Sequence, residues 1–157
     1  MTRLLGIDVG ERRIGLAVAD TEASSVKPLT TIRRRDDARD TDTLRRVCEE
    51  QRIDELVLGL PLNMDGNEGP QAAATREWAA AVAAHVGKPV VWRDERLSST
   101  TAESRMGRAP RGRAGGPPSS AARNQRRARI DREAAATILQ AELDARAAAT
   151  AERATHS

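Results

Sequence analysis

The sequence contains no Phe, no Tyr and only two Trp, so any hydrophobic core must be built from Leu, Ile, Val and Ala. Proteins that bind single-stranded nucleic acid by stacking its bases need aromatic side chains. Trp78 and Trp92 are the only candidates, which nearly excludes this mode of recognition. With 157 residues, the chain is long enough for one compact domain with a sizeable core.

Cysteine is almost absent as well. The single residue, Cys48, excludes an internal disulfide and fits a reducing compartment. We expect it to be a small buried hydrophobe. No apolar stretch is long enough to span a bilayer, and residues 1–20 lack a basic segment followed by a cleavage site. These observations predict a soluble, cytoplasmic protein.

Lysine is rare, because Lys27 and Lys88 are the only two, and nearly every cation is arginine. Arginine favours bidentate contacts with phosphate, although genomic base composition produces the same bias. Residues 104–130 contain no acid and eight arginines: Arg105, Arg108, Arg111, Arg113, Arg123, Arg126, Arg127 and Arg129. Any one of these is most simply a solvated side chain. Together they predict a phosphate-binding arm that contacts the nucleic-acid backbone rather than base edges.

The pattern of apolar residues predicts a mixed sheet flanked by helices, an α/β fold. Strands are expected at 3–9, 14–19, 29–33, 53–60 and 89–92. Helices are expected at 41–51 with Asp40 as N-cap, at 70–86, from Ser98 or Ser99 to about Met106, and at 130–148. The first three strands form an antiparallel meander that continues into parallel strands. One domain is expected over 1–148, with a mobile loop at 107–120 and a flexible tail at 149–157.

Three acidic residues occupy positions where an active site is expected. Asp8 lies near the end of the first strand, Glu95 follows the strand at 89–92, and Asp131 begins the last predicted helix. Open α/β sheets place their sites beyond the carboxyl ends of strands. Carboxylates from three separate elements suit Mg²⁺ or Mn²⁺. His85 and His156 are isolated, so a zinc site is not predicted.

Each of these acids also has a simple structural interpretation. Asp8 could start a turn with Gly10, and Asp131 could be a first-turn acid that favours the positive end of a helix. Glu95 could form a local ion pair with Arg93 or Arg96. Spacing alone leaves both interpretations open.

The pattern from Gly6 to Val18, Gly-Ile-Asp-Val-Gly followed by Ile-Gly-Leu-Ala-Val, admits two functional interpretations. It suits the first strand pair of a nuclease with an RNase H-like fold. It also suits the phosphate-holding hairpin of actin-like ATPases and sugar kinases. That second architecture needs two such domains, whereas this chain supplies one and has no second Asp-x-Gly hairpin.

Four blocks make the comparison more specific. They are Gly6 to Val18, Val57 to Gly66, Asp94 to Ser99, and Ile130 to Leu139. In these blocks the chain resembles the YqgF (RuvX) family of Holliday-junction resolvases, which is also linked to maturation of the 16S ribosomal RNA precursor. The sequence Gly-Leu-Pro-Leu-Asn-Met-Asp-Gly in the second block is the most distinctive. The resemblance covers about residues 3 to 145.

The resemblance implies an RNase H-like fold and a metal-dependent endonuclease. Asp8, Glu95 and Asp131 take the family's acidic positions, where they would be catalytic and hold Mg²⁺ or Mn²⁺. Two ions would clamp the scissile phosphate, one activating a water and the other stabilising the leaving 3′ oxygen. The substrate is branched DNA or structured precursor ribosomal RNA. The chain departs from the family in its arginine-rich segment at 126–130.

Nucleic acid is therefore the expected partner. The predicted contacts are Arg13, Asn63, Arg96, Arg105, Arg123, Arg126, Arg127 and Arg129. Asn63 could instead serve turn chemistry, and Arg13 could pair with Glu11. The alternative function is a non-catalytic nucleic-acid-binding domain, and a weaker one is an ATP-binding module. The alanine-rich faces of residues 72–84 and 134–148 leave room for a homodimer.

Overall fold

The computed structural model describes residues 1–22, 25–94 and 119–156. The described strands are β1 Arg3–Val9, β2 Arg13–Asp20, β3 Val26–Arg33, β4 Glu55–Leu60 and β5 Val90–Asp94. The described helices are α1 Asp37–Glu50, α2 Pro70–Val86 and α4 Ser120–His156. None of these helices is long and apolar enough to cross a membrane.

The strands form one five-stranded sheet in the order β3-β2-β1-β4-β5. β1, β2 and β3 are antiparallel neighbours, whereas β4 runs parallel to β1 and β5 parallel to β4. The predicted mixed sheet is therefore confirmed. These strand directions place five strand termini at the same end of the sheet, namely the ends of β1, β3, β4 and β5 and the start of β2. We call this end of the sheet the hairpin edge.

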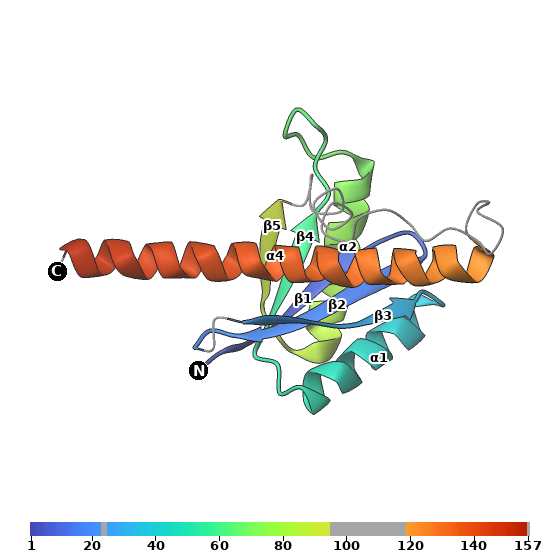
Figure 1. Ribbon diagram of the computed structural model, residues 1–157, viewed down its shortest axis with the longest axis horizontal. Coiled ribbons are helices and arrows are strands. Elements are labelled where there is room, and N and C mark those ends of the chain that lie inside the picture. The colour runs from blue at the N-terminus through green and yellow to red at the C-terminus, as the bar shows by residue number, and fades with distance from the viewer. Residues whose placement is uncertain (23–24, 95–118, 157) are drawn as a thin grey trace.

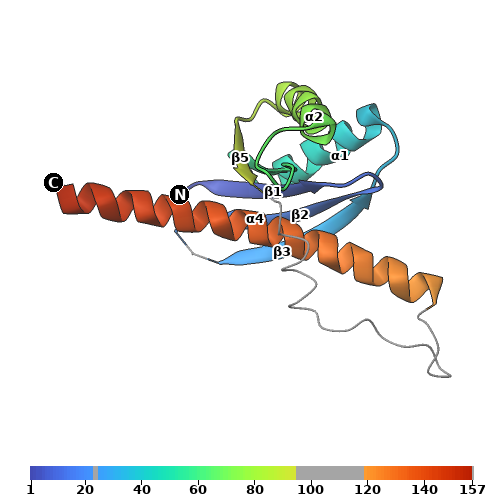
Figure 2. The ribbon, with the colours of Figure 1, turned by 90° about the horizontal axis from the view of Figure 1, so that it is seen from above.

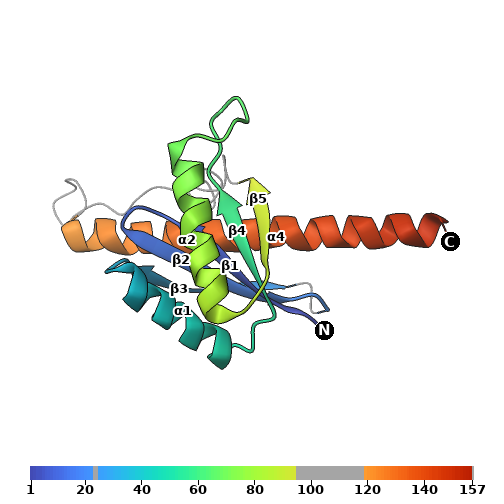
Figure 3. The same ribbon diagram turned by 180° about the vertical axis from the view of Figure 1, so that it is seen from behind.

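Helices cover both faces of the sheet. α4 crosses one face, and α1 and α2 pack on the other (Figures 1 and 3). Side chains of a strand alternate between faces, so β1 contributes to two cores. Leu5 and Ile7 belong to the cluster under α1 and α2. Leu4 belongs to the cluster under α4, together with Ala17 and Leu139.

Two glycines let α4 lie unusually close to the sheet. A Cβ placed at Gly15 would lie well under 3.0 Å from the main-chain oxygen of Asp131. A Cβ at Gly6 would lie 2.8 Å from the main-chain oxygen of Ala135. A glycine inside a strand often marks such an approach of another backbone. The glycines thus fix where the helix crosses β1 and β2.

α4 is longer than the predicted helix at 130–148. Its 37 residues make a rod of roughly 55 Å that extends past the sheet (Figure 2). The earlier start has a local cause, because the hydroxyl of Ser119 accepts a hydrogen bond from the Ala122 N–H at 3.1 Å. Residues 120–129 also contain no Gly or Pro. The expected helix at 98–106 and residues 107–118 of the expected loop lie outside the described residues.

The start of α1 also differs from the prediction. Asp36, rather than Asp40, is the N-cap, and its carboxylate accepts a hydrogen bond from the Arg39 N–H at 2.8 Å. Asp40 lies inside the first turn, is only 1% exposed, and accepts the Arg35 N–H at 3.2 Å. Asp40 therefore does not cap the helix but binds the main chain of the segment between β3 and α1. α2 matches its predicted bounds and ends at Gly87, which has a φ of 74°.

A buried ion network ties the middle of α4 to β4 and β5. Glu142 is 4% exposed and accepts hydrogen bonds from Nε of Arg93 and Nε of Arg146, each at 2.7 Å. Arg146 also donates to both carboxylate oxygens of Glu55, at 3.1 and 3.3 Å. Burial acts to raise the pKa of Glu142, but the bonds from the two arginines outweigh it and lower the pKa.

Candidate active site

Asp8 lies at the hairpin edge on the face of the sheet that α4 covers. It is directly opposite Gly15 in the pairing of β1 with β2, and it is 9% exposed. The alternation of side chains puts it on the same face as Gly6, which contacts α4. The tight turn after β1 is closed by a hydrogen bond from the Gly10 N–H to the Arg13 carbonyl at 2.8 Å. β1 thus holds a nearly buried carboxylate under the helix.

Asp131 is brought to the same place by α4. Its main-chain oxygen packs against Gly15, the cross-strand partner of Asp8. Burial and the nearby charge of Asp8 raise the pKa of Asp131 from 3.8 to about 6, although Arg13 and Arg127 act in the opposite direction. Asp131 also lies well inside α4, which begins at Ser120. The interpretation of Asp131 as a first-turn acid is therefore wrong.

Two carboxylates this close in a partly buried site repel each other unless a cation compensates them. Hard oxygen donors of this kind suit Mg²⁺ or Mn²⁺. No third His, Cys, Asp or Glu joins them within the described parts of the chain. The third predicted acid, Glu95, lies outside those parts, directly after the last residue of β5. The donor set seen here fits a divalent metal ion.

A groove of about 700 Å³ opens beside the two acids. Its described lining is Gly10, Glu11, Arg12, Arg13, Arg127, Ile130 and Asp131. The groove is therefore lined by three arginines and by two acids, Asp131 and Glu11. Arg13 donates to the side-chain oxygen of Asn124 at 3.4 Å, and no ion pair with Glu11 is found within the described residues. The sequence reasoning did not select Arg12 as a site residue.

The arginines after residue 120 lie on a helix rather than in a loop. Arg123, Arg126, Arg127 and Arg129 all belong to the first three turns of α4. Arg127 is one turn before Asp131, so both face the groove. Arg96 and Arg105, which were also predicted to bind nucleic acid, lie outside the described residues.

Asn63 lies in the loop between β4 and α2, which projects from the hairpin edge (Figure 3). Its N–H donates to the Asn67 carbonyl at 2.9 Å, and its own carbonyl accepts the Gly66 N–H at 2.8 Å. A Cβ at Gly69 would lie 3.1 Å from its amide group. Asn63 thus organises a compact loop, and it is not among the described residues that line the groove.

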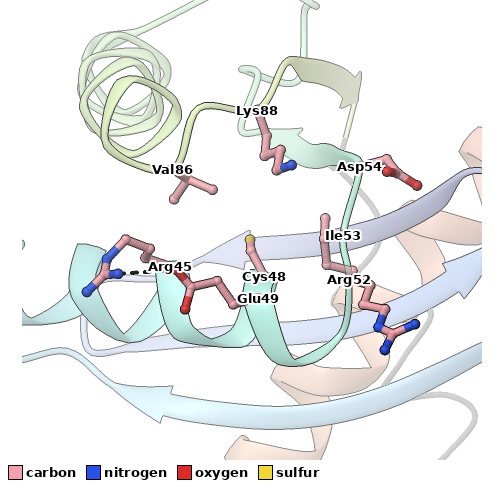
Figure 4. Close-up of a pocket in the computed structure, with 8 residues that line it drawn as sticks. All are labelled: Arg45, Cys48, Glu49, Arg52, Ile53, Asp54, Val86 and Lys88. Atoms are coloured by element: carbon pink, nitrogen blue, oxygen red, sulfur yellow. Dashed lines mark hydrogen bonds and ion pairs between the residues drawn. The ribbon is translucent and has the colours of Figure 1, made fainter.

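A second pocket, of about 350 Å³, lies at the opposite edge of the sheet (Figure 4). It is lined by Arg45, Cys48, Glu49, Arg52, Ile53, Asp54, Val86 and Lys88. Arg45 pairs with Glu49 at 3.2 Å, so part of its charge is neutralised. Cys48 is buried as predicted, and burial raises the pKa of its thiol to about 11. The thiol stays protonated at neutral pH and offers no nucleophile.

Solved structures with the same arrangement of elements identify the fold. RuvC of Thermus thermophilus aligns with a TM-score of 0.55 over 94% of this chain and 97% of that chain, at 15% identity. The structure titled "T. thermophilus RuvC in complex with Holliday junction substrate" aligns with a TM-score of 0.53, over 93% of this chain and 96% of that chain, at 16% identity. At this identity the likeness defines the class, an RNase H-like fold of the RuvC type.

Sequence comparison narrows the class to a family. The family model described as "RuvX: Holliday junction resolvase" matches residues 2–145. A relative from Anaeromyxobacter sp. (strain K) is 47% identical over 92% of this chain and 98% of its own length. One from Moorella thermoacetica is 41% identical over 90% of this chain and 94% of its own length. Both bear the name "Putative pre-16S rRNA nuclease". The chain belongs to the RuvX family of nucleases, as its motifs predicted.

Proposed function

We propose that the protein is an endonuclease that hydrolyses phosphodiester bonds in structured nucleic acid by two-metal-ion chemistry. The substrate is a Holliday junction or the 5′ region of precursor 16S ribosomal RNA. The observation that carries the proposal is the pair of aspartates, Asp8 and Asp131, held together where α4 crosses Gly15. A carboxylate pair next to an arginine-lined groove is suited to cutting a phosphate ester.

Asp8, Asp131 and Glu95 are the proposed catalytic residues, and they would hold Mg²⁺ or Mn²⁺. The raised pKa of Asp131 supports this, because burial and the charge of Asp8 both disfavour its carboxylate, and a bound cation would favour it. When bound, the divalent ions would neutralise the phosphate and lower the pKa of the attacking water. The acids come from separate elements, and their carboxylate oxygens are the donors that hard cations prefer.

The protein's own residues orient the substrate. Arg13 and Arg127 lie in the groove beside Asp131, where they would hold phosphates that flank the bond to be cut. Arg13 donates to Asn124 at 3.4 Å, and Arg127 projects from the helix that carries Asp131. Both arginines therefore lie where a bound phosphate would be close to Asp131.

The first three turns of α4 extend this positive surface. Arg123, Arg126 and Arg129 would contact the backbone further from the cut, giving binding that depends on shape and salt. Asn63, Arg96 and Arg105 remain proposed contacts. Of these, Asn63 is the least direct, since it organises its own loop.

A cleavage assay tests the function. Wild type would be incubated with Mg²⁺ or Mn²⁺ and a four-way DNA junction, a single-stranded RNA, or a precursor 16S fragment. Asp8→Asn removes one carboxylate, and Asp144→Asn is the matched control, because Asp144 is exposed and bonds only Gln140 among the described residues. Metal-dependent cutting that is lost only in Asp8→Asn supports the proposal. Tight binding without cutting would leave the non-catalytic binding domain as the function.

Precursor 16S ribosomal RNA is the first substrate to test. The relatives named for it are 41% and 47% identical to this chain, whereas the junction-bound neighbour is 16% identical. Such a substrate is cytoplasmic, in agreement with the nearly cysteine-free sequence. Symmetrical resolution of a four-way junction would instead use two copies of the site, so a homodimer on junction DNA would favour that substrate.

A further inference from the structure

Two arginines face each other across neighbouring strands at the hairpin edge. Arg13 on β2 and Arg33 on β3 are direct partners in the antiparallel pairing. Thr31, two residues before Arg33, donates to the main-chain oxygen of Ala128 in α4 at 2.6 Å. The alternation of side chains therefore puts Arg33 on the face that α4 covers, beside Arg13. Like charges directly opposite each other destabilise a strand pair.

Within the described parts of the chain, the charge of Asp131 acts on Arg13, but no carboxylate forms an ion pair with either arginine. The Arg13 guanidinium bonds to a neutral amide, and the exposed Arg33 side chain makes no ion pair or hydrogen bond there. Several other described arginines are paired with carboxylates, namely Arg34, Arg39, Arg45, Arg46, Arg76, Arg93 and Arg146. Arg33 thus lies opposite a like charge and has no ion pair of its own among the described residues, so its charge is available to a ligand.

Arg12 joins the pair to the groove. It is exposed and lines the groove with Arg127. Its main-chain oxygen accepts a hydrogen bond from the Arg34 N–H at 2.8 Å, which holds it next to the end of β3. Arg12, Arg13 and Arg33 thus form a continuous positive strip, which we call the arginine strip. It runs from the acidic site to the edge strand of the sheet.

We propose that the arginine strip binds the phosphate backbone of a double-helical arm of the substrate, beyond the bond that is cut. Guanidinium groups bind phosphate in a bidentate manner without reading bases. A single strand is held by stacking as well as by charge, but the chain has no Phe or Tyr, Trp78 is buried and Arg76 lies over the ring of Trp92. The inference rests on the proposed function and adds to it the form of nucleic acid that this side of the site accepts.

The test uses Asp8→Asn as background, so that binding is measured without cutting. Arg33→Gln and Arg33→Glu are compared with Arg153→Gln, which changes an exposed arginine at the far end of α4. Affinity for a duplex RNA and for a single strand of equal length is titrated against salt. We expect Arg33→Gln to lower the salt slope for the duplex by about 0.9 and Arg153→Gln to leave it unchanged.

Arg33→Glu separates binding from folding. A carboxylate opposite Arg13 makes an attractive pair, so this variant should unfold at a higher temperature and yet bind the duplex more weakly. If the salt slope of duplex binding is unchanged in both Arg33 variants, the inference is wrong. If the salt slope of single-strand binding falls as much as that of duplex binding, the strip does not prefer a double helix. Failure of wild type to cut any substrate contradicts the proposed function instead, because the slopes are measured without cutting.

Discussion

The main-chain oxygen of Asp131 packs directly against Gly15, the residue that pairs across the sheet with Asp8. One glycine on β2 therefore sets the separation of two carboxylates that are far apart in the sequence. The contact also explains why α4 must cross the sheet at this point, since a side chain there would push the helix away. The geometry of the site is thus encoded in a residue that has no side chain.

Gly15→Ala should weaken both the fold and the site. A Cβ would overlap the backbone of α4, which cannot move without shifting Asp131, and we expect a loss of about 2 kcal/mol or more in unfolding free energy. Urea unfolding and Mg²⁺ titration would measure the two effects. Gly6→Ala is the control, because it also crowds α4 but lies further from the acids. Equal metal affinity in the two variants would contradict the role given to Gly15.

The metal-free protein should lose stability as the pH rises from about 4 to about 6. Burial and Asp8 raise the pKa of Asp131 to about 6, so the unfolded chain releases this proton at a lower pH than the folded protein. The stabilisation is therefore complete below the pKa that Asp131 has in the unfolded chain. It falls by roughly 2 kcal/mol as the pH rises through the pKa of Asp131 in the folded protein. Asp131→Asn should flatten this dependence and be more stable than wild type at pH 7.5 in a chelator. Urea unfolding at pH 5 and pH 7.5 measures it, and a less stable variant at pH 7.5 would refute the prediction.

Glu142→Gln should destabilise the protein by about 1–2 kcal/mol. The change leaves Arg93 and Arg146 without the buried carboxylate they share, a loss reduced because both arginines are partly solvated. Asp42→Asn is a matched control, since Asp42 also pairs with two arginines but its side chain is 40% exposed, and its loss should cost much less. Thermal unfolding distinguishes the two. Because the pKa of Glu142 is lowered, its contribution should be present at neutral pH and fade on acidification below about 4.5.

Changing Arg126, Arg127 and Arg129 together to Gln should lower the salt slope of nucleic-acid binding by about 2–3. Their helix should persist, because Gln is a good helix former, and circular dichroism would verify this. Arg39, Arg45 and Arg46 provide a control triple, since all three pair with acids of α1 or of its N-cap. A similar slope for both triples would mean that α4 does not bind the backbone.

Much of the fold could be predicted from local sequence. α2 matches at both ends, because Pro70 suits a first helical position and Gly87 takes the left-handed conformation that ends a helix. The start of α1 could not be predicted as well, since Asp36, Asp37 and Asp40 are all able to cap and only the backbone path selects one. The start of α4 was missed for a related reason, as its first turns follow a Gly- and Pro-rich stretch.

The site was predictable in part. Asp8 and Asp131 could be named from their motifs, and the structure brings them together. The pairing of Arg13 with Arg33 could not be predicted from the sequence. The register of β3 on β2 shifts between Leu16 and Ala17, an irregularity with no clear sequence signal. Which residues face each other across two strands depends on such shifts. An acidic residue can be recognised from its motif without knowing the register. Glu95 remains a prediction from sequence.

The position of the second aspartate on α4 has a consequence for synthesis of the protein. Asp8 leaves the ribosome early, but Asp131 follows only after the whole sheet and both helices of the other face have been made. A nascent chain that lacks α4 therefore carries one carboxylate of the pair and an uncovered apolar surface around Leu4 and Ala17. Docking of α4 buries that surface and completes the acidic pair in the same event. Under the proposed function, an unfinished chain thus lacks the carboxylate pair that cutting requires.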